Sequence, residues 1–373
     1  MLYFSISVAG LSITSIIREE SEEMEESLQA YTLSATLLGQ GAYGKIMGGV
    51  HKATGKKVAL KVIARDTGTK CINREVDNLK CLSHKNICEL YEIIETAENT
   101  VLVLEYCQGQ NLSELIMTSE IPLADDLVQS ITSQLLQALQ YMHEQHVAHR
   151  DIKPSNMMIN SEENVVKIID LGLAADAQDL CTDRCGTARY VAPEILQKQP
   201  YDATKADIWS LGVSIYHMLT KQFPFEGKNK GELYSNICNS AFDIPEHISE
   251  QCTDALQKML EKDPCKRWSA HSLLGHPWLA GHIPQSFPSH NKFHIDDKLV
   301  KRVARLTKRS KTSVLADLKE WQFNHTTATY LLLSKEAREM AEDTSISRKN
   351  SSFYRLRRRS SLFCIFGGRR PDE

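Results

Sequence analysis

The octapeptide His149-Arg-Asp-Ile-Lys-Pro-Ser-Asn156, near the middle of the chain, is the most constraining feature of this sequence. It matches the pattern H-R-D-x-x-x-x-N at every fixed position, and Asp170-Leu-Gly172 follows nineteen residues after Asp151. Carboxylate and amide oxygens at fixed spacing suit two tasks, accepting a proton and ligating Mg²⁺. We therefore expect Asp151 to accept a proton from an attacking hydroxyl, and Asn156 and Asp170 to ligate Mg²⁺.

A glycine-rich segment, Gly39-Gln-Gly41-Ala-Tyr-Gly44, lies well upstream of this motif. A dinucleotide-binding fingerprint needs a helix after the glycines, but Ile46–Val50 has the pattern of a strand. A P-loop needs a Ser or Thr where Ile46 stands, and isoleucine has no oxygen for Mg²⁺. The segment therefore favours a hairpin whose backbone N–H groups cover nucleotide phosphates, with a merely structural β-turn as the alternative.

Further motifs follow in a fixed order. Lys61 lies in the apolar run Val58–Ile63, and Glu75 lies in a stretch with helical spacing. A lysine held by a carboxylate can position the α- and β-phosphates of ATP, and Lys153 is placed to neutralise a transferring phosphoryl group. The remaining motifs are Gly186-Thr187, Ala192-Pro-Glu194, Asp207-x-Trp-Ser-x-Gly212 and Arg267. Their order and spacing together argue against coincidence.

With these motifs, residues 31–279 resemble a eukaryotic protein kinase domain, in its Ser/Thr version because of Asp151-x-Lys153 and Gly186-Thr187. The resemblance implies an α+β, bilobal protein kinase fold, with a strand-rich N-lobe, a helical C-lobe, and ATP with Mg²⁺ between them. It implies a non-specific serine/threonine protein kinase that transfers the γ-phosphate of Mg-ATP to Ser or Thr hydroxyls of protein substrates. Leu171 replaces the usual phenylalanine after Asp170 and keeps its apolar character.

The resemblance also assigns residues to roles. The catalytic group is Asp151, Lys153, Asn156, Lys61 and Glu75, and the metal ligands are Asn156 and Asp170. The ATP-binding group is Leu38, Gly39, Gly41, Gly44, Ile46, Ala59, Lys61, Glu105, Cys107, Asn111 and Asp170, with the backbone of Glu105 and Cys107 holding the adenine. Leu79, Leu90, His149 and Leu171 are expected to form an apolar column, and Glu194 to pair with Arg267.

The region after the kinase-like part narrows the family. Residues 295–337, with Asp317-Leu-Lys-Glu-Trp321 and Tyr330-Leu-Leu-Leu333, resemble the three-helix ubiquitin-associated-like domain of kinases related to the AMP-activated protein kinase, and most of all the maternal embryonic leucine zipper kinase family. Trp321, Tyr330 and Leu331–Leu333 are expected in its core. We expect an intramolecular brace rather than ubiquitin binding, because Leu306–Ser310 replaces the Met-Gly-Phe/Tyr-like loop.

The activation segment runs from Asp170 to Glu194. Arg150 is expected to pair with an anionic group in this segment, and two residues are candidates for carrying that group. Thr182 is a candidate phosphorylation site for an upstream kinase, whereas an alignment without a gap places the carboxylate of Asp183 at that position. Thr187 is expected to bridge the catalytic Asp and Lys rather than to regulate.

Charge and composition set the remaining expectations. Residues 343–373 hold eight Lys/Arg and three Asp/Glu, a net of +5, so the body is mildly acidic and no nucleic-acid partner is expected. Residues 338–373 are expected to form a basic, unstructured tail, whose charge is also compatible with weak binding to an anionic membrane. Residues 1–30 are expected as an unstructured acidic extension and 280–294 as a linker. Ten cysteines without metal-like spacing favour reduced thiols and a cytoplasmic location, with nuclear or plasma-membrane pools and a Cys181–Cys185 redox pair as alternatives.

Overall fold

The structure is a computed structural model that describes residues 28–41, 44–65, 69–96, 98–282, 295–338 and 340. Of these, residues 28–50 and 57–282 belong to one compact unit, and residues 51–56 and 295–340 belong to a second. Nearly all of the predicted acidic extension and basic tail, and most of the predicted linker, lie outside the described residues. Within the described ranges, no helix is both long and apolar enough to cross a membrane.

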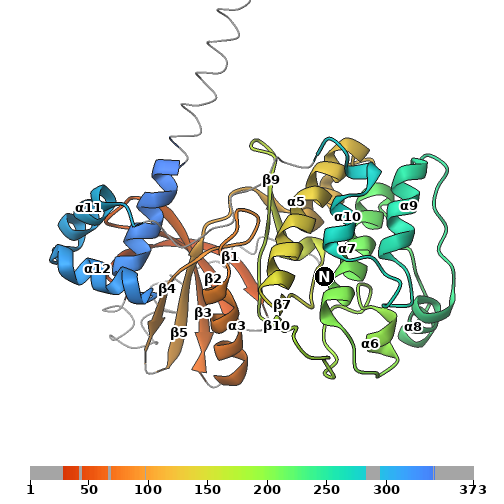
Figure 1. Cartoon of the computed structure of the whole chain (residues 1–373), viewed down its shortest axis with the longest axis horizontal. Helices are drawn as coiled ribbons and strands as arrows, with labels where there is room; N and C mark the ends of the chain where they lie inside the picture. Colours follow the sequence, from red (N-terminus) through yellow and green to blue (C-terminus); the bar gives the residue numbers. More distant parts are fainter. Residues whose placement is uncertain are drawn as a thin grey trace, which may run out of the picture. The chain divides into compact units, whose positions relative to one another are not determined.

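A five-stranded sheet begins the first unit and forms the smaller lobe (Figure 1). Its order is β1-β2-β3-β5-β4, and the pairs β2–β3, β3–β5 and β5–β4 are antiparallel. The strands are β1 (Tyr31–Gly41), β2 (Gly44–His51), β3 (Lys57–Ala64), β4 (Leu90–Glu95) and β5 (Asn99–Glu105). Because strand β2 follows the glycine-rich segment and lies beside β1 in the sheet, the strand-then-helix alternatives are excluded.

Gly44 begins β2 where two backbones come very close. A Cβ at this position would lie 2.1 Å from the carbonyl oxygen of Val62 on β3. Such an approach is possible only without a side chain, which explains why the third glycine of the segment stands here. The helix α3 (Thr69–Cys81) follows β3 and lies beside the sheet (Figure 1).

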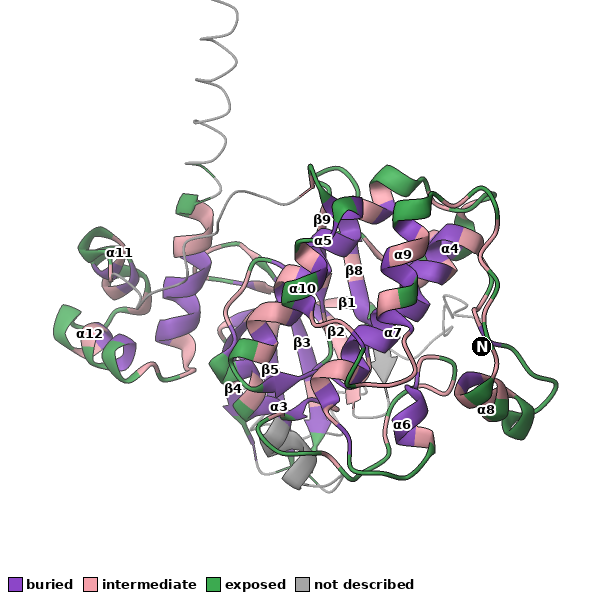
Figure 2. Ribbon diagram, turned by 45° about the vertical axis from the view of Figure 1, so that its right-hand side comes forward, coloured by how far each residue is buried: buried purple, intermediate pink, exposed green. Residues whose placement is uncertain are grey.

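Helices dominate the larger lobe of the first unit. Its central helix α7 (Ala203–Thr220) is apolar all round, and Figure 2 shows it almost entirely in the buried colour. Trp209 on α7 is fully buried at the centre of one core cluster, stacked on Phe225. The other elements are α4 (Leu112–Thr118), α5 (Asp125–Glu144), α6 (Pro193–Leu196), α8 (Lys230–Asn239), α9 (Glu250–Met259), α10 (Ala270–Leu274) and η3 (Pro277–Leu279).

Two small sheets fix the ends of the loops that carry the predicted catalytic residues. A three-stranded sheet has the order β6-β8-β9, and β7 pairs with β10. The elements are β6 (Gln110–Asn111), β7 (Val147–Ala148), η2 (Pro154–Asn156), β8 (Met157–Asn160), β9 (Val165–Ile168) and β10 (Ala175–Asp176). The octapeptide 149–156 therefore starts directly after β7 and ends at β8, so it is fixed at both ends.

The second unit contains the three helices that the sequence predicts: α11 (Asp297–Thr307), α12 (Lys311–Glu320) and a helix at 325–338. Its core consists of Val300, Val303, Val314, Leu318, Tyr330 and Leu333. Leu331 and Leu332 are buried as well. The prediction is wrong for Trp321, which is only half-buried because it ends α12 as a left-handed C-cap with φ of 50°.

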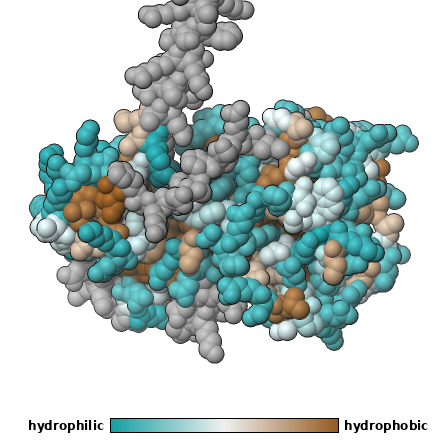
Figure 3. Space-filling view, in the orientation of Figure 1, coloured by the Kyte–Doolittle hydropathy of each residue, from teal (hydrophilic) through white to brown (hydrophobic). Residues whose placement is uncertain are grey.

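Most of the first unit's surface in the view of Figure 3 carries hydrophilic residues, and hydrophobic residues form small separate areas. Among the described residues of both units, the exposed large hydrophobic side chains are Leu37, Leu38, Met117, Ile121, Leu180, Leu306 and Met340.

Candidate active site

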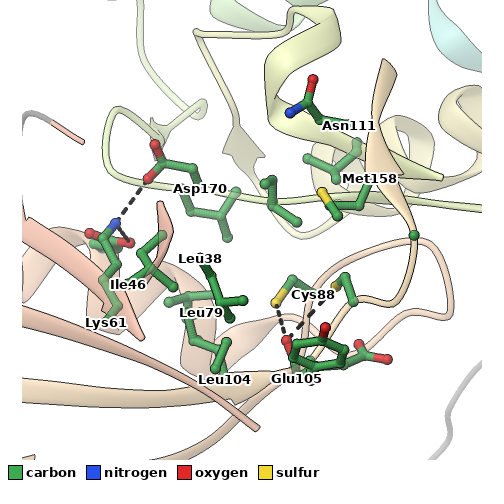
Figure 4. A pocket seen from close by; sticks show the side chains of 18 of the residues that line it. Leu38, Ile46, Lys61, Leu79, Cys88, Leu104, Glu105, Asn111, Met158 and Asp170 are labelled. Carbon is green, nitrogen blue, oxygen red and sulfur yellow. Dashed lines mark hydrogen bonds and ion pairs between the residues drawn. The ribbon is translucent and has the colours of Figure 1, made fainter. Parts of the chain in front are cut away.

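A cleft between the two lobes of the first unit brings most of the predicted nucleotide site together (Figure 4). The predicted residues that line it are Leu38, Ile46, Ala59, Lys61, Glu75, Glu105, Cys107, Asn111 and Asp170. Gly39, Gly41 and Gly44 lie in the β1–β2 hairpin and are not among the lining residues. Sequence reasoning missed other lining side chains as nucleotide contacts, namely Cys88, Glu114, Met158, Ile168 and Ile169. The apolar run Met157–Ile159 after the octapeptide was the available signal for Met158.

Lys61 is the charged centre of the cleft. Its Nζ lies 2.5 Å from Glu75 Oε1 and 2.9 Å from Asp170 Oδ1. Alternation along β3 places Ala59 and Lys61 on the same face, toward the cleft, while Val58 and Leu60 are fully buried. Thus β3 and α3 together hold the ammonium group beside the carboxylate of Asp170.

The charges at Lys61 support one another. Burial disfavours the ammonium form, but the two carboxylates outweigh this effect, so the pKa of Lys61 lies above its ordinary value. Burial would raise the pKa of Asp170, yet the positive charge of Lys61 lowers it below its ordinary value. Asp170 is therefore ionised and available to a cation.

The segment after β5 offers a donor and an acceptor for a planar base. The Glu105 carbonyl oxygen accepts weak hydrogen bonds from two thiols, Cys88 Sγ at 3.7 Å and Cys107 Sγ at 3.9 Å. Over the described part of the chain, the Cys107 N–H donates to no acceptor. An adenine edge needs this combination of a carbonyl and a free N–H, so the residues fit the predicted nucleotide.

Asp151, Lys153 and Thr187 form one hydrogen-bonded cluster. Lys153 Nζ lies 2.6 Å from Asp151 Oδ2 and donates to Thr187 Oγ1 at 2.8 Å. Thr187 Oγ1 in turn donates to Asp151 Oδ1 at 2.8 Å. The Thr187 hydroxyl thus bridges the Lys153 ammonium group and the Asp151 carboxylate, and it ties the activation segment to the octapeptide.

The carboxylate of Asp207 on α7 holds the backbone at the start of the octapeptide. The backbone N–H groups of His149 and Arg150 donate to its two carboxylate oxygens at 2.9 and 2.7 Å, and all of Asp207 is buried. Arg150 has φ of 64°, a left-handed conformation that needs such support. The buried α7 therefore fixes the backbone just before Asp151, while Lys153, Thr187 and Asn156 contact its carboxylate.

Asn156 and Asp170 suit Mg²⁺ by their oxygen atoms. The amide nitrogen of Asn156 donates to the backbone and carboxylate of Asp151 at 2.9 and 3.1 Å, which leaves its amide oxygen for a cation. Across the described residues, no group of three or more His, Cys, Asp or Glu side chains can hold a metal ion by itself. Mg²⁺ bound to nucleotide phosphates needs only one or two protein ligands, so this pair is sufficient.

Two predicted structural features accompany the site. Leu79, Leu90, His149 and Leu171 are all buried. Asn111 has a local role besides lining the cleft, because its side chain accepts from the Glu114 N–H at 2.9 Å and caps α4. Its side-chain oxygen accepts this bond, and its amide nitrogen is available to donate to a ribose.

Comparison with known proteins agrees with this geometry. Residues 33–279 match the protein kinase domain, and residues 295–336 match the UBA domain of maternal embryonic leucine zipper kinase. Maternal embryonic leucine zipper kinase of Xenopus tropicalis is 36% identical over 323 residues, covering 84% of this chain and 49% of the relative. The same kinase of Danio rerio is 35% identical over 329 residues, covering 85% and 48%.

The SNF-related serine/threonine-protein kinase of Homo sapiens is 33% identical over 337 residues, covering 86% of this chain and 44% of the relative. The chain spans about half the length of the curated relatives it matches. The match to the kinase domain covers more than half of the chain and includes every residue of the cleft described above. The chain therefore belongs to the protein kinase family.

Proposed function

We propose that this chain is a serine/threonine protein kinase that transfers the γ-phosphate of Mg-ATP to Ser or Thr hydroxyls of protein substrates. The observation that carries the proposal is the cluster of Asp151, Lys153 and Thr187, with contacts of 2.6 to 2.8 Å. The human relative is a serine/threonine-protein kinase, which supports the choice of Ser and Thr hydroxyls.

Each residue has a defined task in this proposal. Asp151 orients the substrate hydroxyl and accepts its proton, and Lys153 stabilises the negative charge that develops during transfer. Lys61, held by Glu75, positions the phosphates, and Asn156 with Asp170 would hold Mg²⁺. ATP supplies the phosphoryl group when bound. Catalysis then rests on positioning and electrostatic stabilisation.

The test is transfer of labelled γ-phosphate from Mg-ATP to a generic protein substrate, comparing wild type with Asp170→Asn. We expect wild type to label Ser and Thr, and the variant to lose about 10²–10³ in rate because the carboxylate that holds the cation is gone. Phosphoamino-acid analysis of the product identifies the hydroxyl. A wild-type protein that binds ATP but labels nothing under any condition would instead indicate a scaffold.

The three-helix domain is proposed to act as a brace for the kinase domain, in preference to binding ubiquitin. The second unit includes residues 51–56, the turn between β2 and β3, together with the three helices. His51 is fully buried, and its Nε2 lies 3.3 Å from His325 Nδ1 and 3.4 Å from Thr329 Oγ1. Lys56 pairs with Glu336 at 3.8 Å. Because β3 carries Lys61, a fastened turn would stabilise the strand that positions the phosphates.

The brace predicts a measurable role for His51. Replacing it with alanine should lower the free energy of unfolding at pH 7 by about 1–3 kcal/mol, since His325 and Thr329 lose a buried partner. Burial and the nearby His325 hold the pKa of His51 at about 4. The unfolded chain, with a histidine pKa near 6.5, therefore binds a proton that the folded chain excludes, and this part of the stability falls as the pH falls from about 6.5 toward 4.

Urea unfolding at pH 7 and pH 5 checks this prediction. The difference between wild type and His51→Ala should narrow at pH 5. His247→Ala is the matched control, because His247 is exposed in the first unit and its replacement should change stability at neither pH. Equal effects of the two variants would contradict the brace, as would capture of the wild-type chain on immobilised ubiquitin.

The partners that follow from the proposal are proteins with accessible Ser or Thr hydroxyls. The predicted membrane association of the basic tail concerns residues mainly outside the described part of the chain, and the cytoplasmic location stays a prediction.

A further inference from the structure

The activation segment contains an ion pair that the catalytic cluster does not explain. Arg150 Nη1 lies 2.6 Å from Asp183 Oδ1, and the Arg150 side chain is only 2% exposed. Burial disfavours a charged guanidinium, but the hydrogen bond to Asp183 outweighs this effect, and the pKa of Arg150 lies above its ordinary value. A buried guanidinium of this kind requires an anion, and Asp183 supplies it.

Arg150 connects three parts of the chain. Its Nε donates to the Leu173 carbonyl at 2.7 Å, three residues after the cation-holding Asp170. Its backbone N–H is held by Asp207, and Asp151 follows it directly in sequence. Through Asp183, the same side chain fixes the activation segment. A single guanidinium thus sets the positions of the octapeptide, the segment after Asp170 and the activation segment.

Asp183 is fixed from its backbone as well as from its side chain. The Tyr201 hydroxyl donates to the Asp183 carbonyl at 3.0 Å, and Cys181 and Tyr201 exchange two backbone hydrogen bonds of 2.9 Å. Thr187, four residues further on, is the member of the catalytic cluster that bonds Asp151. At ~3.3–3.6 Å per residue, fixing Asp183 strongly limits where Thr187 can lie.

Thr182 does not share this position. It is exposed, and among the contacts of the described residues its hydroxyl has no hydrogen-bond partner. Gly186 packs close to the Arg150 carbonyl, with 3.1 Å between that oxygen and a Cβ built on the glycine. The segment therefore meets Arg150 at Asp183 and passes it at Gly186, and the side chain of Thr182 plays no part in either contact.

We infer that Asp183 is a positioning residue that replaces an activating phosphate, so that this chain is catalytically competent without phosphorylation of its activation segment. The inference rests on the proposed kinase function. A carboxylate carries one negative charge where a phosphate carries about 1.5–2. The ion pair is also partly open to solvent, because the Asp183 side chain is 57% exposed. Its effect therefore depends on the charge at this position, which gives a direct test.

The experiment uses the full chain, expressed in bacteria, treated with a phosphatase and shown by intact mass to be phosphate-free. Wild type, Thr182→Ala, Asp183→Asn and Asp183→Glu are compared for kcat, the KM for ATP and the unfolding midpoint. We expect wild type and Thr182→Ala to be equally active. Asp183→Asn should lose about 10–100-fold in kcat, as expected when a catalytic group is displaced by about 1 Å, and Asp183→Glu should regain most of it.

Two readouts separate positioning from general damage. Neither Arg150 nor Asp183 lines the nucleotide cleft, so the KM for ATP should stay unchanged in Asp183→Asn. The unfolding midpoint of Asp183→Asn should fall only slightly, because the amide oxygen can still accept the hydrogen bond from Arg150 and the side chain at position 183 is 57% exposed. If the negative charge at position 183 is what matters, Asp183→Glu should be active and Asp183→Asn should not.

Several results would overturn the inference. Wild type that is silent when phosphate-free but active after incubation with a cell extract and ATP would show that phosphorylation is required, while the kinase function would stand. Full activity of Asp183→Asn, or an equally inactive Asp183→Glu, would show that the charge of Asp183 is not what matters. Wild type that stays silent in both forms would contradict the kinase function itself.

Discussion

Asp151→Asn is expected to lose about 10²–10⁴ in kcat while its affinity for ATP stays within a few-fold of wild type. The amide cannot accept a proton, so the attacking hydroxyl keeps it during transfer. The surrounding loop should stay in place, because the buried Asp207 holds the backbone N–H groups of His149 and Arg150. The loss is thus chemical rather than structural.

Single-turnover transfer of labelled phosphate, together with a fluorescent-nucleotide titration, measures both quantities. Asp179→Asn is the matched control, since it makes the same change at an exposed position of the activation segment and should keep full activity. If Asp151→Asn kept more than about a tenth of the wild-type rate, Asp151 would not be the proton acceptor. If its ATP affinity fell in parallel, the variant would have disturbed the cleft.

Local sequence was sufficient for the parts of the site whose contacts lie within one element or recur at fixed spacing. The apolar run Val58–Ile63 predicts that Lys61 lies in a strand, and the octapeptide predicts Asp151 and Asn156 in one short segment. The strand pattern of Ile46–Val50 predicts the hairpin at the glycines. In each case short-range geometry decides, although burial does not alternate along β3, which is an inner strand of the sheet.

Other features depend on contacts that no local pattern encodes. Thr182 and Asp183 are adjacent, and only the path of an exposed segment past Arg150 decides which of them meets it. Trp321 looks like a core residue by type, yet the left-handed C-cap of α12 leaves it only half-buried. His51 and His325 are 274 positions apart, and neither residue predicts the other. These positions are set by tertiary packing, which overrides local preference.

The largest stability effect is expected at Arg267, which the family resemblance predicts to pair with Glu194. Its two terminal nitrogens donate to the two Glu194 carboxylate oxygens at 2.7 and 3.0 Å. It also donates to the carbonyls of Glu261 at 2.8 Å and Lys205 at 2.9 Å, and it lies over the Trp209 ring at 5.1 Å. The Arg267 side chain is 0% exposed and that of Glu194 6%, so both charges depend on each other.

Arg267→Ala should therefore lower the free energy of unfolding by about 3–5 kcal/mol, because the Glu194 carboxylate stays buried without a counter-charge. Arg267→Lys should recover only part of this, since an ammonium cannot form the two parallel bonds. The double variant Arg267→Met/Glu194→Leu, in which neither charge remains, should be more stable than Arg267→Ala. Urea unfolding followed by tryptophan fluorescence measures all three, because Trp209 lies in the same contact.

Arg184→Ala is the control for removing an arginine without removing this contact. Arg184 is exposed, and over the described residues it takes part in no ion pair, so its loss should change stability by less than about 0.5 kcal/mol. If Arg267→Ala were no less stable than Arg184→Ala, the buried pair would be irrelevant to the helical lobe. If the double variant were the least stable, the packing of Arg267 on Trp209, rather than the unpaired carboxylate, would be the dominant contribution.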